Sequence, residues 1–278
     1  MPRLRDALIA EVCGTFLLVL FGTGVVATAV LTEAQVGLWQ VAAVWGFGVT
    51  IAIAATTGVS GAHLNPAVTL AMAVFRGGAF PRSRALPYMA AQLLGAVLAG
   101  CVVLAVFSPF LDRFERANQI VRGEAGSEAS AMVFGEYFPN PAIFPDAADA
   151  DLVSPLRAAG VEAFGTAVLV FVIFALTDGR RAPVGGAITP LLIGFTVAVL
   201  ISLFAPVTQA GWNPARDFGP RLVAFAAGWG EVAIPGPHNG FWVYILGPLA
   251  GGLAGGAVYE VTLGRVRATA ADERSRFA

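Results

Sequence analysis

Six long apolar stretches divide this chain of 278 residues. Most are close to the roughly 20 residues that an α-helix needs to cross the hydrocarbon core of a bilayer. Polar segments, or segments marked by Gly and Pro, separate them, as expected for breaks between helices. The pattern predicts six transmembrane helices at these positions: Ala7–Leu31, Leu38–Thr57, Arg84–Phe107, Gly160–Thr177, Ala187–Phe204 and Gly240–Leu263.

Two shorter apolar runs, each opened by Asn-Pro-Ala, cannot cross a bilayer alone. At the α-helical rise, Pro66–Phe75 would span about 15 Å and Pro214–Phe225 about 18 Å. Asn is a favoured N-cap, and Pro is tolerated at the first helical position because its missing N–H would be unpaired there. Since the two lengths together match a hydrocarbon core of about 30 Å, we expect two half-helices that meet near the bilayer midplane.

The chain also contains an internal repeat. Glu11-x-x-Gly-Thr opens the first span and Glu162-x-x-Gly-Thr opens the fourth, and Asn65 and Asn213 follow at similar intervals. Each copy holds three spans and one half-helix, and the odd number of spans inverts the second copy in the membrane. Inverted repeats with broken helices are typical of transport proteins with a solute site at the midplane.

We therefore expect one membrane domain over residues 1–278, with both termini on the same side. Its predicted parts are a first repeat (about 7–107), an outer loop rich in acids, Pro and Gly (about 108–157), a second repeat (about 158–263) and a C-terminal tail (about 264–278). The Arg residues near helix ends gather on the side of the termini, which the positive-inside bias assigns to the cytoplasm. The first apolar run is too long for a signal peptide and is interpreted as a helix.

Composition agrees with a membrane protein and limits the partners. The chain is 57% hydrophobic and 13% charged, against about 25% charged in soluble domains. The net charge of −1 gives no reason to expect a nucleic-acid partner. Cys13 and Cys101 are isolated in apolar spans, so we interpret both as small core residues rather than a disulfide or metal site. We expect no cofactor.

The segments before the half-helices, Gly58–Leu64 and Ala205–Trp212, are expected to be irregular. Irregular backbone at membrane depth must be buried in protein or line a water-filled cavity, so its free carbonyls would accept hydrogen bonds from a polar solute. The expected acceptors are Gly61, Ala62, His63, Gln209, Ala210 and Gly211. Asn65 and Asn213 would cap the half-helices through their side-chain oxygens and turn their amide N–H groups toward the lumen.

Charged residues near the meeting point predict exclusion of ions. Arg216 lies in the first turn of the second half-helix, and an intramembrane Arg is a functional candidate. Together with the positive ends of two helix dipoles it would repel cations and protons. Glu11 and Glu162 are expected to brace the irregular loops, with His63 as a candidate partner of Glu11. Asp217 is expected to anchor the second loop.

These features resemble the aquaporin and glycerol facilitator family of major intrinsic proteins. The resemblance rests on the doubled Asn-Pro-Ala motif, the two Glu-x-x-Gly-Thr openings and Ser60-Gly61-Ala62-His63. It implies an all-α, aquaporin-like fold with six transmembrane helices, two re-entrant half-helices, one pore per subunit and a homotetrameric assembly. Asp217 after Asn-Pro-Ala-Arg, and the segments 120–123 and 137–141 of the outer loop, are similar to bacterial glycerol uptake facilitators, which implies a bacterial plasma-membrane location.

The same resemblance implies a selectivity filter of Trp45, Ile201, Ala210 and Arg216. Ile201 stands where water channels usually have His and glycerol facilitators Gly, and Ala210 stands where glycerol facilitators usually have Phe. The combination looks like the nodulin-type channels of plants. Trp45 and Ile201 would form an apolar wall opposite Arg216.

The leading hypothesis is a passive channel for glycerol and water that excludes ions and protons. Alternatives of the same fold are a water-selective channel and a channel for urea or metalloid acids. An ion-coupled secondary transporter is a further alternative, although the spans hold few ionisable residues. An intramembrane hydrolase is disfavoured because Ser60 and His63, three positions apart in a loop, do not by themselves form a nucleophile–base pair.

Overall fold

The computed structural model describes residues 2–179 and 186–265 and contains helices and turns, with no strand in those ranges. Its α-helices are α1 (Leu4–Thr32), α2 (Leu38–Ser60), α3 (Pro66–Phe75), α4 (Ala85–Ala117), α5 (Glu128–Ala131), α6 (Pro155–Thr177), α7 (Thr189–Thr208), α8 (Pro214–Ala224), α9 (Gly230–Ala233) and α10 (Val243–Tyr259). Over the described residues six segments, containing α1, α2, α4, α6, α7 and α10, are long and apolar enough to cross a membrane. The predicted six spans are confirmed.

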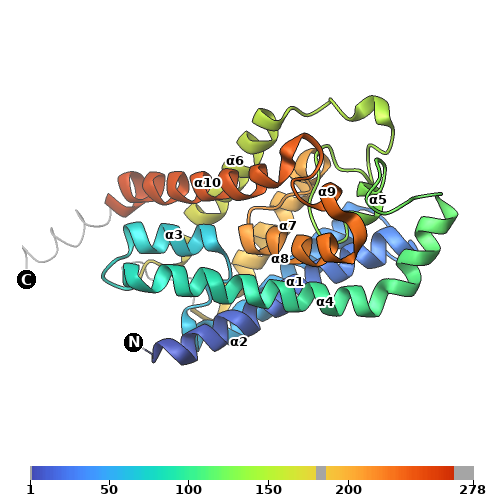
Figure 1. Cartoon of the computed structure of the whole chain (residues 1–278). Helices are drawn as coiled ribbons and strands as arrows, with labels where there is room; N and C mark the ends of the chain where they lie inside the picture. Colours follow the sequence, from blue (N-terminus) through green and yellow to red (C-terminus); the bar gives the residue numbers. More distant parts are fainter. Residues whose placement is uncertain (1, 180–185, 266–278) are drawn as a thin grey trace, which may run out of the picture.

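The two repeats pack in equivalent ways. In the first repeat α1 packs on α2 and α4, and in the second α6 packs on α7 and α10. Helices α2 and α7 join the repeats, and each half-helix packs on the last span of the other repeat: α3 on α10, and α8 on α4. Helix α1 begins and α10 ends at one end of the bundle, whereas α5 and α9 lie at the other end (Figure 1).

Small residues bring α2 and α7 close together where the repeats meet. A Cβ atom built on Gly46 of α2 would lie 2.7 Å from the carbonyl oxygen of Gly194 on α7. A Cβ on Gly194 would collide in turn with the Gly46 carbonyl and the Thr50 hydroxyl. Because transmembrane helices associate through close packing rather than through a hydrophobic driving force, these glycines permit the contact between the repeats.

Several predicted boundaries are wrong in a consistent direction. Helix α4 continues to Ala117, and α6 begins at Pro155, so the outer loop is shorter than residues 108–157. Hydropathy marks where the apolar span ends, but hydrogen bonding can carry a helix further into polar surroundings. Likewise α2 extends to Ser60 and α7 to Thr208, which limits the irregular backbone to the last few residues before each half-helix.

The two cysteines are not core residues, contrary to the expectation from sequence. Cys13 and Cys101 are both free and exposed on the surface of this chain. The outside of a membrane helix bundle is as apolar as its inside, so an apolar neighbourhood does not identify the buried face. Three of the Arg residues on the predicted cytoplasmic side, Arg180, Arg181 and Arg267, lie outside the described residues, as does nearly all of the predicted C-terminal tail.

Candidate functional site

A cavity of about 390 Å³ runs between the two repeats, from Trp45 on α2 past both half-helix starts to Phe80 beyond α3. Its lining contains most of the residues expected from the sequence: Trp45, Gly61, Ala62, His63, Asn65, Ile201, Ala210, Gly211, Asn213 and Arg216. Glu11, Glu162 and Asp217 are fully buried behind the lining. The structure thus brings both Asn-Pro-Ala motifs and the four expected filter residues to one cavity.

Gln209 departs from its expected place among the acceptors. It does not line the cavity. Its side-chain oxygen accepts a hydrogen bond from the backbone N–H of Tyr137 at 2.7 Å, and its side-chain N–H group faces the carbonyl of Met132 at 3.5 Å. The irregular segments before α3 and α8 are called the first and second pore loops below. Gln209 therefore ties the second pore loop to the outer loop. Its position in the sequence, beside Ala210, does not reveal this contact between distant segments.

Each pore loop holds unusual backbone conformations. Ala62 and Leu64 in the first loop, and Ala210 and Trp212 in the second, have positive φ angles between 47° and 69°. Left-handed backbone at residues other than Gly is uncommon and costs on the order of 1–3 kcal/mol per residue. Such a conformation persists only where surrounding contacts enforce it.

Glu11 supplies those contacts for the first loop. One carboxylate oxygen accepts from the Ser60 hydroxyl at 2.6 Å and the His63 backbone N–H at 2.9 Å. The other accepts from the Leu64 N–H at 2.8 Å and the side chain of Gln92 at 2.7 Å. The partner of Glu11 at position 63 is thus the backbone, not the imidazole ring.

Glu162 makes the equivalent contacts to the second loop. One oxygen accepts from the Thr208 hydroxyl at 2.7 Å and the Gly211 N–H at 3.0 Å, and the other accepts from the Trp212 N–H at 2.7 Å. Both carboxylates therefore fix backbone N–H groups that have no helical partner, and as acceptors they do not compete for the carbonyls of the same loops.

Ser60 and His63 do not form a nucleophile–base pair. The Ser60 hydroxyl donates to Glu11, and Nδ1 of His63 lies 3.3 Å from the Thr69 hydroxyl. The geometry gives no support to the hydrolase hypothesis at this loop.

The two capping asparagines also join the half-helices to each other. The side-chain oxygen of Asn65 accepts from the N–H of Ala67 at 2.8 Å, and that of Asn213 accepts from the N–H groups of the first turn of α8. The amide nitrogen of Asn65 donates to the Trp212 carbonyl at 2.9 Å, and that of Asn213 donates to the Leu64 carbonyl at 2.9 Å. One N–H of each amide is thus engaged across the repeats, so at most one remains for a solute, fewer than the sequence predicts.

Arg216 lies between an aromatic face and a carboxylate. Its guanidinium carbon is 4.7 Å from the centre of the Trp45 ring, and one terminal nitrogen is 3.4 Å from the Phe134 carbonyl. The other terminal nitrogen is 3.0 Å from Oε1 of Glu136. Both side chains of this ion pair are almost fully buried.

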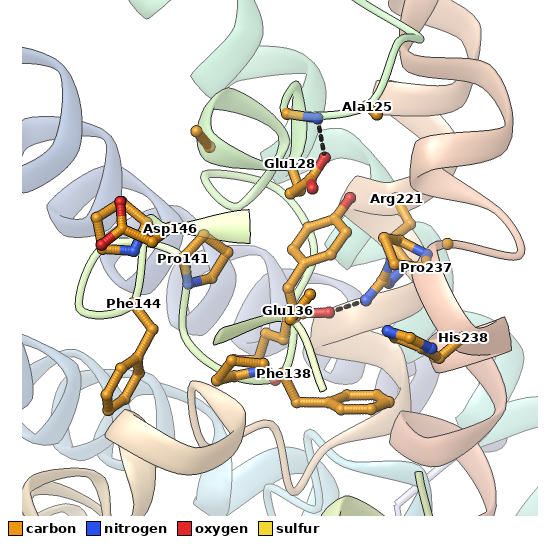
Figure 2. A pocket seen from close by; sticks show the side chains of 18 residues that line it. Ala125, Glu128, Glu136, Phe138, Pro141, Phe144, Asp146, Arg221, Pro237 and His238 are labelled. Carbon is orange, nitrogen blue, oxygen red and sulfur yellow. Dashed lines mark hydrogen bonds between the residues drawn. The ribbon is translucent and has the colours of Figure 1, made fainter. Parts of the chain in front are cut away.

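The sequence did not identify Glu136 as a site residue. It is one of many acids in the outer loop, where an acid is usually solvated. Its backbone N–H donates to Oδ1 of Asp217 at 2.8 Å, and its carbonyl accepts from Arg221 (Figure 2). Asp217 also pairs with Arg221 at 2.7 Å, so this ion pair anchors the outer loop rather than contacting the cavity. Burial raises the pKa of the Glu136 carboxyl above the usual range of glutamic acid, and Arg216 opposes that rise.

Comparison with known proteins places this arrangement in a family. A sequence model described as major intrinsic protein matches residues 2–259. The chain belongs to the major intrinsic protein family. It is 42% identical to the glycerol uptake facilitator protein of Pseudomonas aeruginosa over 95% of this chain and 91% of that one. It is 39% identical to the propanediol uptake facilitator of Citrobacter freundii, over 94% of this chain and 93% of the other.

A solved structure supports the fold independently. The aquaglyceroporin from Plasmodium falciparum superposes with a TM-score of 0.81, covering 96% of this chain and 100% of the other at 22% identity. The aquaporin-like fold expected from the sequence, with paired half-helices inside six spans, is confirmed.

Proposed function

We propose that this protein is a passive channel for glycerol and other small uncharged solutes, with water passing as well and ions excluded. The observation that carries the proposal is the wall composition where Arg216 faces the cavity: Trp45 and Ile201 are apolar, and the guanidinium offers N–H donors. Such a wall suits a molecule with hydroxyls on one side and C–H groups on the other. The relatives named as glycerol and propanediol facilitators support the same solute class.

The direct test is solute entry into proteoliposomes. Glycerol entry should be much faster than in protein-free vesicles, and a protonophore should not change its rate. Entry of urea, arsenous acid and sorbitol, measured in the same preparation, would rank the accepted solutes. Fast water entry without glycerol entry would favour the water-selective alternative, and a glycerol flux that follows the proton gradient would favour a coupled transporter.

We also propose a cytoplasmic location for both termini and a homotetrameric assembly. The positive-inside bias supports the first, and family membership supports the second. Protease accessibility of a C-terminal tag in oriented vesicles and light scattering of the detergent-solubilised protein, respectively, test them.

Ile201 is expected to set the width of the filter. Its side chain lines the cavity and is only 4% exposed, so Ile201→Phe should place added volume in the lumen. Glycerol flux should fall by about tenfold, the change that corresponds to roughly 1.4 kcal/mol in a barrier. Water flux should fall less, because a water molecule is smaller and passes through a narrower opening. Leu203→Phe on the exposed face of α7 is the matched control. Equal losses of water and glycerol flux in Ile201→Phe would contradict a filter role.

A further inference from the structure

The carboxylate of Glu136 has no counterpart among the residues expected at the filter. Its Oε1 is 3.0 Å from Arg216, whereas its Oε2 is buried with no hydrogen-bond partner in the described residues. We propose that Glu136 is a specificity-determining residue of this channel: it positions the Arg216 guanidinium on the pore wall and cancels its charge. The filter then offers N–H donors to a solute without a net positive charge.

The first support is that the position of Glu136 is fixed by its surroundings. Its N–H and carbonyl are held by Asp217 and Arg221, and these two are themselves paired and buried. The outer loop is thereby clamped to α8 at Asp217, the residue after Arg216, and at Arg221. The side chain of Glu136 is 1% exposed, so it cannot turn to solvent while this clamp is in place.

The second support is the space left for the carboxylate beside the second pore loop. A Cβ atom built on Gly211 would collide with Oε2 of Glu136 and would lie 2.9 Å from Oε2 of Glu162. Only glycine at position 211 leaves room for both carboxylates. Glu162 accepts its hydrogen bonds from its own loop, and Arg221 pairs with Asp217. Among the described residues, Arg216 is therefore the cation that contacts the Glu136 carboxylate.

The third support is the electrostatic balance. Arg stays protonated at accessible pH, and a buried guanidinium is strongly unfavourable without a counter-charge. Burial raises the pKa of the Glu136 carboxyl, and the Arg216 guanidinium 3.0 Å away opposes that rise and favours the ionised form. In that form the pair is neutral as a whole and presents a local dipole. Ion exclusion at the filter would then depend on desolvation and on the half-helix dipoles rather than on a free positive charge.

Two substitutions separate the positioning effect from the charge effect. Glu136→Gln keeps an oxygen that accepts from Arg216 but removes the negative charge, and Glu136→Ala removes both. This inference rests on the proposed glycerol function for its positioning part only, because the charge part is measured with ions. The matched control is Glu124→Gln, which makes the same charge change at an exposed site in the same loop.

The measurements are nitrate and potassium leak, together with glycerol and water entry, in proteoliposomes of the full chain. Both Glu136 variants should raise the ratio of nitrate to potassium leak by more than about tenfold, since one buried charge is left uncompensated. Glu136→Ala should lower glycerol entry by about fivefold, the change that corresponds to one ordinary hydrogen bond. Glu136→Gln should restore it to within about twofold of the unaltered protein.

Specific outcomes would overturn the proposal. An unchanged ion-leak ratio in both variants would refute charge cancellation, and equal glycerol entry in the Ala and Gln variants would refute positioning. If the unaltered protein conducts no glycerol, the proposed function fails, but the ion-leak ratio still decides the charge part and water entry still reports on Arg216.

Discussion

Replacing Arg216 by valine is expected to make the channel leak monovalent cations and protons while water and glycerol continue to pass. The substitution removes the cation from the wall and leaves the Glu136 carboxylate, 3.0 Å away in the native protein, without its partner. A unit charge at about 4 Å is worth about 4 kcal/mol at an effective dielectric constant of about 20. The cation leak should therefore rise well above tenfold, since about 1.4 kcal/mol corresponds to each factor of ten.

The double variant Arg216→Val with Glu136→Gln shows whether charge causes the leak. It widens the filter to the same extent but removes the carboxylate at position 136 that would lack its partner, so its cation leak should be clearly lower than in Arg216→Val. Breaking a buried ion pair typically costs about 3–5 kcal/mol, so thermal unfolding in detergent must accompany the flux measurements. Arg113→Val on an exposed part of α4 is the control. A proton and cation leak unchanged by Arg216→Val would refute the role of Arg216 in excluding cations and protons.

The half-helices could be predicted because their signals are local. Asn65 and Asn213 are each followed by Pro, and capping depends only on the first turn of the same helix. The predicted bounds of α3 agree with the structure, and those of α8 differ by one residue. The inverted repeat then brought the two starts together, because equivalent segments of an inverted repeat enter from opposite faces.

The contribution of the outer loop to the filter, through Glu136, could not be predicted in the same way. Glu136 reaches Arg216 from a position 80 residues earlier in the chain, through a loop whose course depends on Asp217 and Arg221. Periodicity carries no information on such contacts, and an acid in a loop is normally solvated. The one available signal was Gly211, whose missing side chain leaves room for two carboxylates. From sequence alone that glycine is explained equally well as a flexible loop residue.

Replacing Glu11 by alanine is expected to abolish most solute flux by releasing the first pore loop. Four donors, from Ser60, His63, Leu64 and Gln92, lose their acceptor at once. Each buried donor left without a partner costs about 1–3 kcal/mol. The side-chain acceptor that remains among the described residues for the N–H groups of the strained loop is weaker: the Ser60 hydroxyl, which accepts a single hydrogen bond from the Ala62 N–H at 3.0 Å. Glycerol entry per protein should drop more than about tenfold, and the unfolding temperature should fall by several degrees.

Glu11→Gln provides the graded comparison for this prediction. It retains one acceptor oxygen but turns an N–H group toward donors, so its flux and unfolding temperature should lie between those of the Ala variant and the unaltered protein. Glu33→Ala, an exposed acid immediately after the same helix, should change neither quantity. Glycerol entry above about half of the unaltered rate in Glu11→Ala would contradict the bracing role, because releasing even one buried donor should change the rate more than that. In that case the buried Glu11 carboxylate would not be the group that holds the carbonyls of the first pore loop in place.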